Sequence, residues 1–302
     1  MSFALPPLTP ASAVSDGIVP HTTSRGVAFV QLYQRLGLLG EYMYAPFEKN
    51  YDTNPGTEFT RDHWALPLVA VTIYMAAIFF GKKYMASRER MDLRYKLAAW
   101  NCFLCLFSFA GALRTVPEVL YRLGSQELSS TICQDPSESW GVGATGLWVQ
   151  LFIFSKFPEL IDTYFIVARK RPLLFLHWYH HVTVLLYCWH SYATEASQAL
   201  YFVAMNYSVH AIMYGYYCLM ALKIPSGIPP VLITAAQISQ MVVGVAVQLV
   251  ASYQYFYPTE GSSCNVNGAN IFWGGLMYAS YFGLFTKFAV ERYLAKPQKK
   301  VV

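Results

Sequence analysis

Three histidines stand close together in a part of the sequence that is otherwise apolar. They are His177, His180 and His181, within the run His-Trp-Tyr-His-His. Spacings of three and four residues place all three imidazoles on one face of a helix. A buried polar side chain needs a partner, so three on one face are hard to explain as packing residues. We therefore expect these imidazoles to act as nucleophile, base or acid.

A second polar face follows later in the chain. Asn206, His210, Tyr214 and Tyr217 recur at intervals close to one helical turn. This face supplies a fourth imidazole, an amide and two phenols. We expect His210 to face the first three histidines across a shared interior, with the tyrosine hydroxyls orienting it.

A third polar run precedes the histidines. Lys156, Glu159 and Thr163 fall on one helical face, and Pro158 weakens the backbone hydrogen bonding there. A helix end at the membrane interface, with Lys156 paired to Glu159, would also explain this run. Both interpretations remain open from the sequence.

A fourth polar face lies closer to the C-terminus. Thr234, Gln237 and Gln240 share one side of a helix. Glutamines in a lipid-embedded segment need hydrogen-bond partners, so these should point inward. Contacts between helices and contacts with a substrate explain them equally well.

The elements that hold these residues are predicted to be membrane helices. Of 302 residues, 55% are hydrophobic and only 13% are charged, whereas a soluble domain carries about a quarter charged residues. A membrane helix needs about 20 mostly apolar residues. We predict seven spans, at 64–81, 97–121, 141–168, 173–192, 197–222, 230–257 and 269–290. The net charge of +5 is spread without a basic face, which argues against nucleic-acid binding.

The distribution of Lys and Arg predicts the orientation. These residues gather after the first, third and fifth spans and in the tail, whereas loops 122–140 and 258–268 hold one Arg and no Lys. The basic loops belong on the cytosolic side. We therefore predict a lumenal, partly ordered N-terminal segment at 1–62, a seven-span domain at 63–291 and a cytosolic tail at 292–302.

The cysteines fall into two groups. Cys133 and Cys264 lie in loops that this topology places in the lumen, where disulfides persist. We predict a bond between them, with two free thiols as the alternative. The other four cysteines lie within spans, and none has the surroundings of a catalytic nucleophile.

Together these motifs resemble those of the fatty-acid elongase (ELO) family. The run Lys-x-Pro-Glu-x-x-Asp-Thr from Lys156 resembles its first motif, and the run from His177 resembles its histidine box. The runs from Asn206 and Thr234 resemble its third and fourth motifs. The four occur in the family's order, and the resemblance covers roughly residues 60–295.

The resemblance implies an all-α membrane protein with seven transmembrane helices, the last six forming a barrel around an acyl tunnel. It implies a 3-ketoacyl-CoA synthase of the endoplasmic reticulum that condenses malonyl-CoA with a long-chain acyl-CoA and needs no metal or other cofactor. Other enzymes of the elongation cycle are expected partners. Trp178 and the run from Gly111 to Thr115 resemble the subfamily that elongates saturated and monounsaturated chains. Lys299 and Lys300 resemble a dilysine retrieval signal, although a solvated basic tail is the alternative.

The residues and the resemblance give a set of roles. His180 is the expected nucleophile, forming an acyl-imidazole, while its histidine neighbours fix its tautomer. A mechanism in which the histidines act only as acid and base is the alternative. The predicted catalytic residues are His177, His180, His181, His210 and Asn206. The predicted substrate and CoA contacts are Lys156, Glu159, Asp162, Arg169, Lys170, Arg171, Tyr214, Tyr217, Gln237 and Gln240.

Two other functional classes compete with this interpretation. A membrane desaturase or hydroxylase also uses histidine boxes, but it needs several boxes, and this chain has one box and seven histidines in total. A zinc site built from the four clustered histidines is a variant of the same idea. A transporter or receptor would also have several spans, but a clustered histidine site without pairs of broken helices fits neither.

Overall fold

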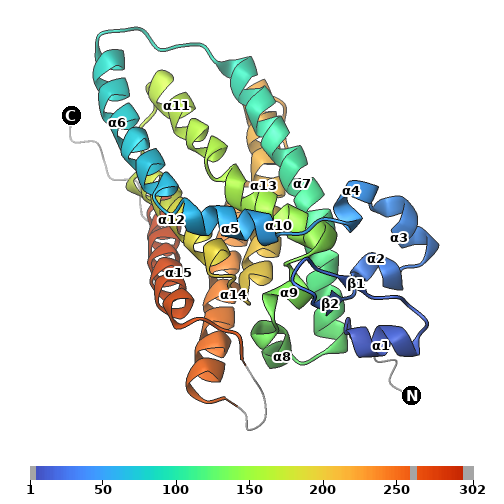
Figure 1. Cartoon of the computed structure of the whole chain (residues 1–302). Coiled ribbons are helices and arrows are strands. Elements are labelled where there is room, and N and C mark those ends of the chain that lie inside the picture. The colour runs from blue at the N-terminus through green and yellow to red at the C-terminus, as the bar shows by residue number, and fades with distance from the viewer. Residues whose placement is uncertain (1–4, 259–263, 295–302) are drawn as a thin grey trace.

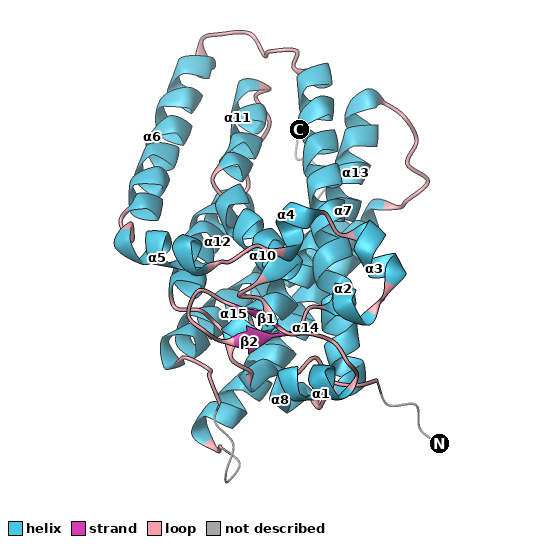
Figure 2. Ribbon diagram, turned by 45° about the vertical axis from the view of Figure 1, so that its right-hand side comes forward, coloured by secondary structure: helices cyan, strands magenta, loops and turns pink. Residues whose placement is uncertain are grey.

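The computed structural model describes residues 5–258 and 264–294, and helices dominate both segments (Figures 1 and 2). The N-terminal region is built from short elements. A two-stranded antiparallel hairpin pairs His21 with Phe29. Its elements are α1 (Pro10–Ser15), β1 (His21–Thr22), β2 (Ala28–Phe29), α2 (Leu32–Arg35), α3 (Leu38–Met43), α4 (Pro46–Lys49) and α5 (Asn54–Asp62).

The remaining helices follow the predicted spans. They are α6 (Leu66–Ala86), α7 (Arg94–Ser125), α8 (Leu128–Cys133), α9 (Pro136–Ser139), α10 (Gly143–Ser155), η1 (Pro158–Leu160), α11 (Ile161–Ala168), α12 (Phe175–Ala193), α13 (Ala199–Leu222), α14 (Pro230–Phe256), α15 (Gly268–Ala289) and η2 (Val290–Leu294). Within the described ranges, α6, α7 and α14 are long and apolar enough to cross a membrane by length and composition.

The third predicted span, 141–168, is not one continuous helix but breaks where Pro158 was expected to weaken the backbone hydrogen bonding. Helix α10 ends at Ser155, and a short 3-10 turn begins at Pro158 before α11 continues the chain. Proline has no backbone N–H and crowds the preceding turn, so the regular hydrogen-bond ladder cannot pass through it. The break falls within the polar run that starts at Lys156.

Six helices contact one another in a closed circuit. Helix α7 packs on α13, α13 on α14, α14 on α15, α15 on α12, α12 on α10, and α10 returns to α7. Helix α6 packs on α11 and α12, and Figure 1 shows it at one side of the molecule. The functional motifs of the sequence therefore lie on neighbouring helices.

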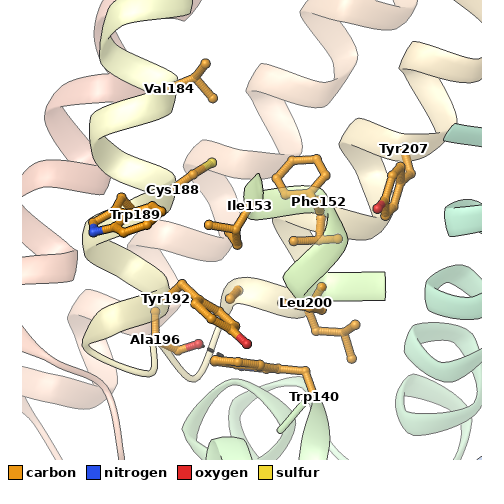
Figure 3. Packing of buried hydrophobic residues seen from close by; sticks show 13 residues of the cluster. Trp140, Phe152, Ile153, Val184, Cys188, Trp189, Tyr192, Ala196, Leu200 and Tyr207 are labelled. Carbon is orange, nitrogen blue, oxygen red and sulfur yellow. Dashed lines mark hydrogen bonds between the residues drawn. The ribbon is translucent and has the colours of Figure 1, made fainter. Parts of the chain in front are cut away.

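A packed aromatic cluster fills the interior between α10, α12 and α13 (Figure 3). At one edge of the cluster lies Trp140, whose side chain is completely buried and whose indole N–H donates to the carbonyl of Ala196 at 2.9 Å. Tyr192 packs against the Trp140 ring at 5.5 Å between centroids. The large Trp140 ring has its one polar atom hydrogen-bonded, so it can be buried in the core without leaving a polar group unpaired.

The N-terminal region is fastened to the helices by one buried carboxylate. The Glu48 side chain is only 3% exposed. It accepts hydrogen bonds from Arg114 Nε on α7 at 3.0 Å, from Trp148 Nε1 on α10 at 2.7 Å and from the backbone N–H of Ala45 at 2.9 Å. Burial acts to raise the pKa of Glu48, but these hydrogen bonds outweigh it and hold the pKa below its usual value.

A disulfide joins two distant parts of the chain. Cys133 at the end of α8 is bonded to Cys264, which precedes α15, as the loop topology predicted. The neighbouring backbone N–H of Asn265 donates to the Cys133 carbonyl at 3.0 Å. The predicted dilysine signal at residues 299 and 300 lies outside the described residues.

Candidate active site

The predicted catalytic residues converge on one cavity of about 510 Å³. Helix α12 contributes the three histidines of the box, and α13 contributes the remaining imidazole and the amide. All five predicted catalytic residues line this cavity: His177, His180, His181, Asn206 and His210. Helix periodicity thus correctly predicted which side chains share an interior face.

Most of the predicted substrate contacts line the same cavity, and two do not. Those that do are Glu159, Asp162, Arg169, Arg171, Tyr214, Tyr217, Gln237 and Gln240. Lys156 is instead buried, with its Nζ 2.7 Å from Glu159 Oε1 and 3.9 Å from the centre of the Phe152 ring. Lys170 donates to the carbonyl of Ala86 at 3.1 Å.

Asp162 holds three elements together. Its two carboxylate oxygens accept hydrogen bonds from Trp100 Nε1 on α7 at 2.6 Å and from the Tyr214 hydroxyl on α13 at 2.7 Å. The Tyr214 ring in turn meets the His210 ring edge-on, with centroids 5.3 Å apart. Asp162 therefore positions the wall of the cavity behind His210.

The histidines of α12 have different neighbours. The His177 ring lies 4.6 Å from the His181 ring, and its Nε2 is 2.9 Å from the Thr163 hydroxyl. The His180 ring lies 5.6 Å from His181 and 5.1 Å from Tyr281 of α15. The sequence predicted that His177 would flank His180, but its close ring contact is with His181 one turn further on.

Three residues that line this cavity have buried polar atoms without partners, as do five residues elsewhere in the described part of the chain. Among the described residues, His181 Nδ1, Asn206 Oδ1 and Glu159 Oε2 are buried and make no hydrogen bond. Such atoms are rare in folded proteins because each costs the desolvation of a polar group. All three residues line the cavity, so these atoms are available to a bound ligand.

A smaller cavity of about 50 Å³ adjoins the first. The two share His180, Asn206, Gln240 and Met241 as lining residues. The walls of the smaller one are mainly apolar, and its lining extends along α12 to Ser191, roughly 16 Å from His180 at the helical rise. His180 thus stands where a polar space meets an apolar one.

Comparison with known proteins identifies the family. Residues 59–301 match the model of the ELO family, described as the GNS1/SUR4 family. The chain belongs to this family. The resemblance inferred from the four motifs is thereby confirmed.

Named relatives of this ELO protein are elongases. It is 42% identical over 251 residues to very long chain fatty acid elongase 6 of Drosophila melanogaster, covering 82% of this chain and 78% of that protein. It is 39% identical to the Homo sapiens protein of the same name, covering 84% and 94% respectively. Fatty acid elongase 3 of Trypanosoma cruzi is 38% identical, with 78% and 86% covered. The chain is thus a multi-pass membrane enzyme of fatty acid elongation.

Several residues that contact the lining of the elongase cavity carry no recognisable sequence signal. Trp100, Tyr74 and Tyr281 are aromatic residues in apolar helices, and the chain has 7 Trp and 23 Tyr in all. Asn101 is the exception, because an amide in the apolar α7 stands out, and it is 4% exposed and lines the cavity. Polarity within a span could have identified Asn101, but only the fold identifies the aromatic residues.

The described residues contain no group of three or more His, Cys, Asp or Glu side chains arranged to hold a metal ion.

Proposed function

We propose that this elongase is a 3-ketoacyl-CoA synthase that condenses malonyl-CoA with a long-chain acyl-CoA through an acyl-His180 intermediate. The observation that carries the proposal is the position of His180, which lines both the polar cavity and the apolar one. A thioester at the junction of a charged CoA head and an apolar chain would have its carbonyl beside this imidazole.

The two cavities lie in the order of the two halves of the substrate, and the apolar one, at about 50 Å³, would have to widen to hold a long acyl chain. The apolar cavity extends along α12 for roughly 16 Å from His180, close to one leaflet of a hydrocarbon core that is about 30 Å thick in all. Arg169 and Arg171 line the polar cavity near the end of α11 and would bind the phosphates of CoA. The closed circuit of six helices supports the barrel that this arrangement requires.

The first chemical step splits the thioester. A neutral imidazole nitrogen of His180 attacks the carbonyl carbon, the carbon–sulfur bond breaks, and CoA leaves as the thiol with the proton that the acylated ring gives up. This forms an acyl-imidazole and frees the polar cavity for malonyl-CoA. One difficult reaction thus becomes two easier ones.

The second step forms the carbon–carbon bond. Malonyl-CoA loses carbon dioxide, and the electron pair left on its C2 attacks the acyl carbon. The bond to His180 breaks, and the ring regains a proton. Asn206 and His210 lie on the opposite helix of the cavity, where donors can stabilise the enolate oxygen that develops.

The setting of the enzyme completes the proposal. We place it in the endoplasmic reticulum membrane with seven spans, a lumenal N-terminus and a cytosolic C-terminus, on the asymmetry of Lys and Arg between the loops. The other enzymes of the elongation cycle would then receive the 3-ketoacyl-CoA on the cytosolic side. Trp178 and the Gly111–Thr115 run favour saturated and monounsaturated substrates.

The test measures the condensation activity of the enzyme and its dependence on metal ions in the same preparation. Purified enzyme in lipid vesicles receives labelled malonyl-CoA with a panel of acyl-CoAs, and its metal content is measured in the same preparation. The proposal predicts labelled 3-ketoacyl-CoA, released carbon dioxide and activity unaffected by chelators. Oxidised acyl products that depend on bound iron would instead establish the histidine-box desaturase or hydroxylase class.

A further inference from the structure

A hydrogen-bonded chain enters the histidine site from helix α6. The Tyr74 hydroxyl lies 2.7 Å from Thr163 Oγ1, and the same Thr163 atom lies 2.9 Å from His177 Nε2. Tyr74 is 6% exposed and Thr163 is 2% exposed, so both bonds are shielded from solvent. A side chain on a helix with none of the four motifs therefore reaches a histidine of the box through one intermediate.

The surroundings of Tyr74 determine where its hydroxyl proton is donated. Tyr74 and Thr163 also line a largely apolar groove of about 690 Å³ between α6 and α11. The charged residues that line this groove are Arg88 and Glu89. At a helical rise of about 1.5 Å per residue, they lie about 20 Å from Tyr74. Within the described residues, Thr163 is the only hydrogen-bond partner of the Tyr74 hydroxyl.

The phenol proton must therefore go to Thr163, because any other direction leaves it unpaired beside an apolar groove. The Thr163 hydroxyl has its own proton to place, and among the described residues its oxygen has only the Tyr74 hydroxyl and His177 Nε2 as partners. Because the Tyr74 hydroxyl is the donor in the first bond, the Thr163 proton is paired only if it is donated to His177 Nε2. An imidazole that accepts at Nε2 carries its own proton at Nδ1. The relay thus selects one of the two neutral tautomers of His177.

We propose that Tyr74 is a positioning residue that holds His177 in the Nδ1-protonated tautomer through Thr163. The tautomer of His177 sets the hydrogen-bonding character of the ring that packs on His181 at 4.6 Å. Tyr74 itself touches no reacting atom. The proposal rests on the proposed function for its kinetic consequence, but not for the tautomer itself.

Tyr74→Phe is the appropriate change, because it removes only the hydroxyl. The Tyr74 ring also lies 6.4 Å from the His181 ring, and phenylalanine keeps that contact and the packing. Tyr84→Phe is the matched control, since Tyr84 lies on the same helix and lines the same groove but has its ring against Arg88. A pair at the middle position, Thr163→Val and Thr163→Ser, separates the hydroxyl from the shape of the side chain.

The tautomer is read directly by ¹⁵N NMR of histidine-labelled enzyme in lipid vesicles, with the His177 signals assigned by their loss in His177→Asn. Wild type, Tyr84→Phe and Thr163→Ser should show His177 protonated at Nδ1. Tyr74→Phe and Thr163→Val should show a mixture of tautomers. This measurement needs no substrate, so its failure overturns the relay and leaves the condensation chemistry to its own assay.

Kinetics supply the second readout. In Tyr74→Phe and Thr163→Val, kcat should fall about 10- to 100-fold, by analogy with the outer hydrogen-bond partners of metal-bound histidines, with KM for acyl-CoA unchanged. Thr163→Ser should restore most of kcat. A single Nδ1-protonated signal in Tyr74→Phe overturns the proposal, and so does wild-type kcat in that variant. If Tyr74→Phe does not fold, the Thr163→Val and Thr163→Ser pair decides by the same criteria.

Discussion

Two buried polar regions of this elongase differ in how completely their polar atoms are hydrogen-bonded. Around Glu48, both carboxylate oxygens accept hydrogen bonds, from Arg114, Trp148 and the Ala45 backbone. Around the histidine box, His181 Nδ1 and Asn206 Oδ1 are buried with no partner in the described part of the chain. Both regions lie in the protein interior, and only one of them is satisfied.

We infer from this difference that the Glu48 region serves stability and the histidine region serves function. A buried charge that is fully hydrogen-bonded fastens elements together, and Glu48 fastens the N-terminal region to α7 and α10. A buried polar atom left without a partner costs stability and is retained where a ligand completes it. Substitutions in the first region should lower the free energy of unfolding and spare turnover. Substitutions in the second should lower turnover and leave the free energy of unfolding nearly unchanged.

The largest expected effect is on turnover. His180→Ala should lower condensation by about three orders of magnitude or more, because no neighbour can replace a covalent carrier. Its thermal unfolding should stay close to that of wild type. His63→Ala is the control, since His63 is exposed at the end of α5 and does not line the cavity. Substantial activity in His180→Ala would make the histidine cavity a structural region like that around Glu48.

The largest expected effect on stability is at Glu48. Glu48→Ala leaves the Arg114 guanidinium without its carboxylate partner, and breaking such a buried pair costs about 3–5 kcal/mol. Thermal unfolding in detergent should shift accordingly, with kcat unchanged well below the transition. Glu41→Ala removes an exposed ion-pair partner of Lys49 and should shift unfolding far less. Equal shifts in the two variants would contradict the comparison.

We expect the disulfide, like the Glu48 region, to contribute to stability and not to turnover. Cys133→Ser should lower the free energy of unfolding by about 2–4 kcal/mol, because the bond closes a long stretch of chain. Cys264→Ser should match it, and the double variant should add nothing further. Cys102→Ser, at an exposed free cysteine, is the control. Alkylation of Cys133 in the native protein without reductant would refute the bond.

The smallest expected effect is a dependence of stability on pH. The pKa of Glu48 is lowered in the folded protein, since its hydrogen bonds outweigh the effect of burial. The carboxylate therefore stabilises the fold above its unfolded pKa of 4.5, and that contribution is lost as pH falls through the folded value. Unfolding followed from neutral pH downward should show this loss in wild type. The loss should be absent in Glu48→Gln, and an identical profile in that variant would assign it to other groups.

The sequence predicted the long helices of the fold better than the breaks and connections between them. Apolar runs located the helices because lipid-facing segments must be long and uncharged. The weak point at Pro158 was predicted from the residue itself, but the sequence did not predict that a 3-10 turn would form there. The short elements of the N-terminal region carry no long periodic pattern, so their packing against Arg114 and Trp148 could not be predicted.

The candidate site was predictable to the extent that it follows helical periodicity. The histidines, Asn206 and Tyr214 share faces, and the spacing revealed this. Lys156 fits the same periodicity but pairs with Glu159 instead of lining the cavity, because a buried ammonium needs a close counter-charge. Tyr74 and Trp100 reach the site from other helices, and no local pattern reports which distant segments will meet.

Formation of an acyl-enzyme at His180 can be measured without the second substrate. The enzyme is incubated with acyl-CoA alone, released CoA is counted, and the quenched protein is digested and analysed by mass. The account predicts about one equivalent of CoA per enzyme and an acyl mass on the peptide that contains His180, with neither in His180→Ala. Intact acyl-CoA until malonyl-CoA is added, with no modified peptide at any time, would contradict it.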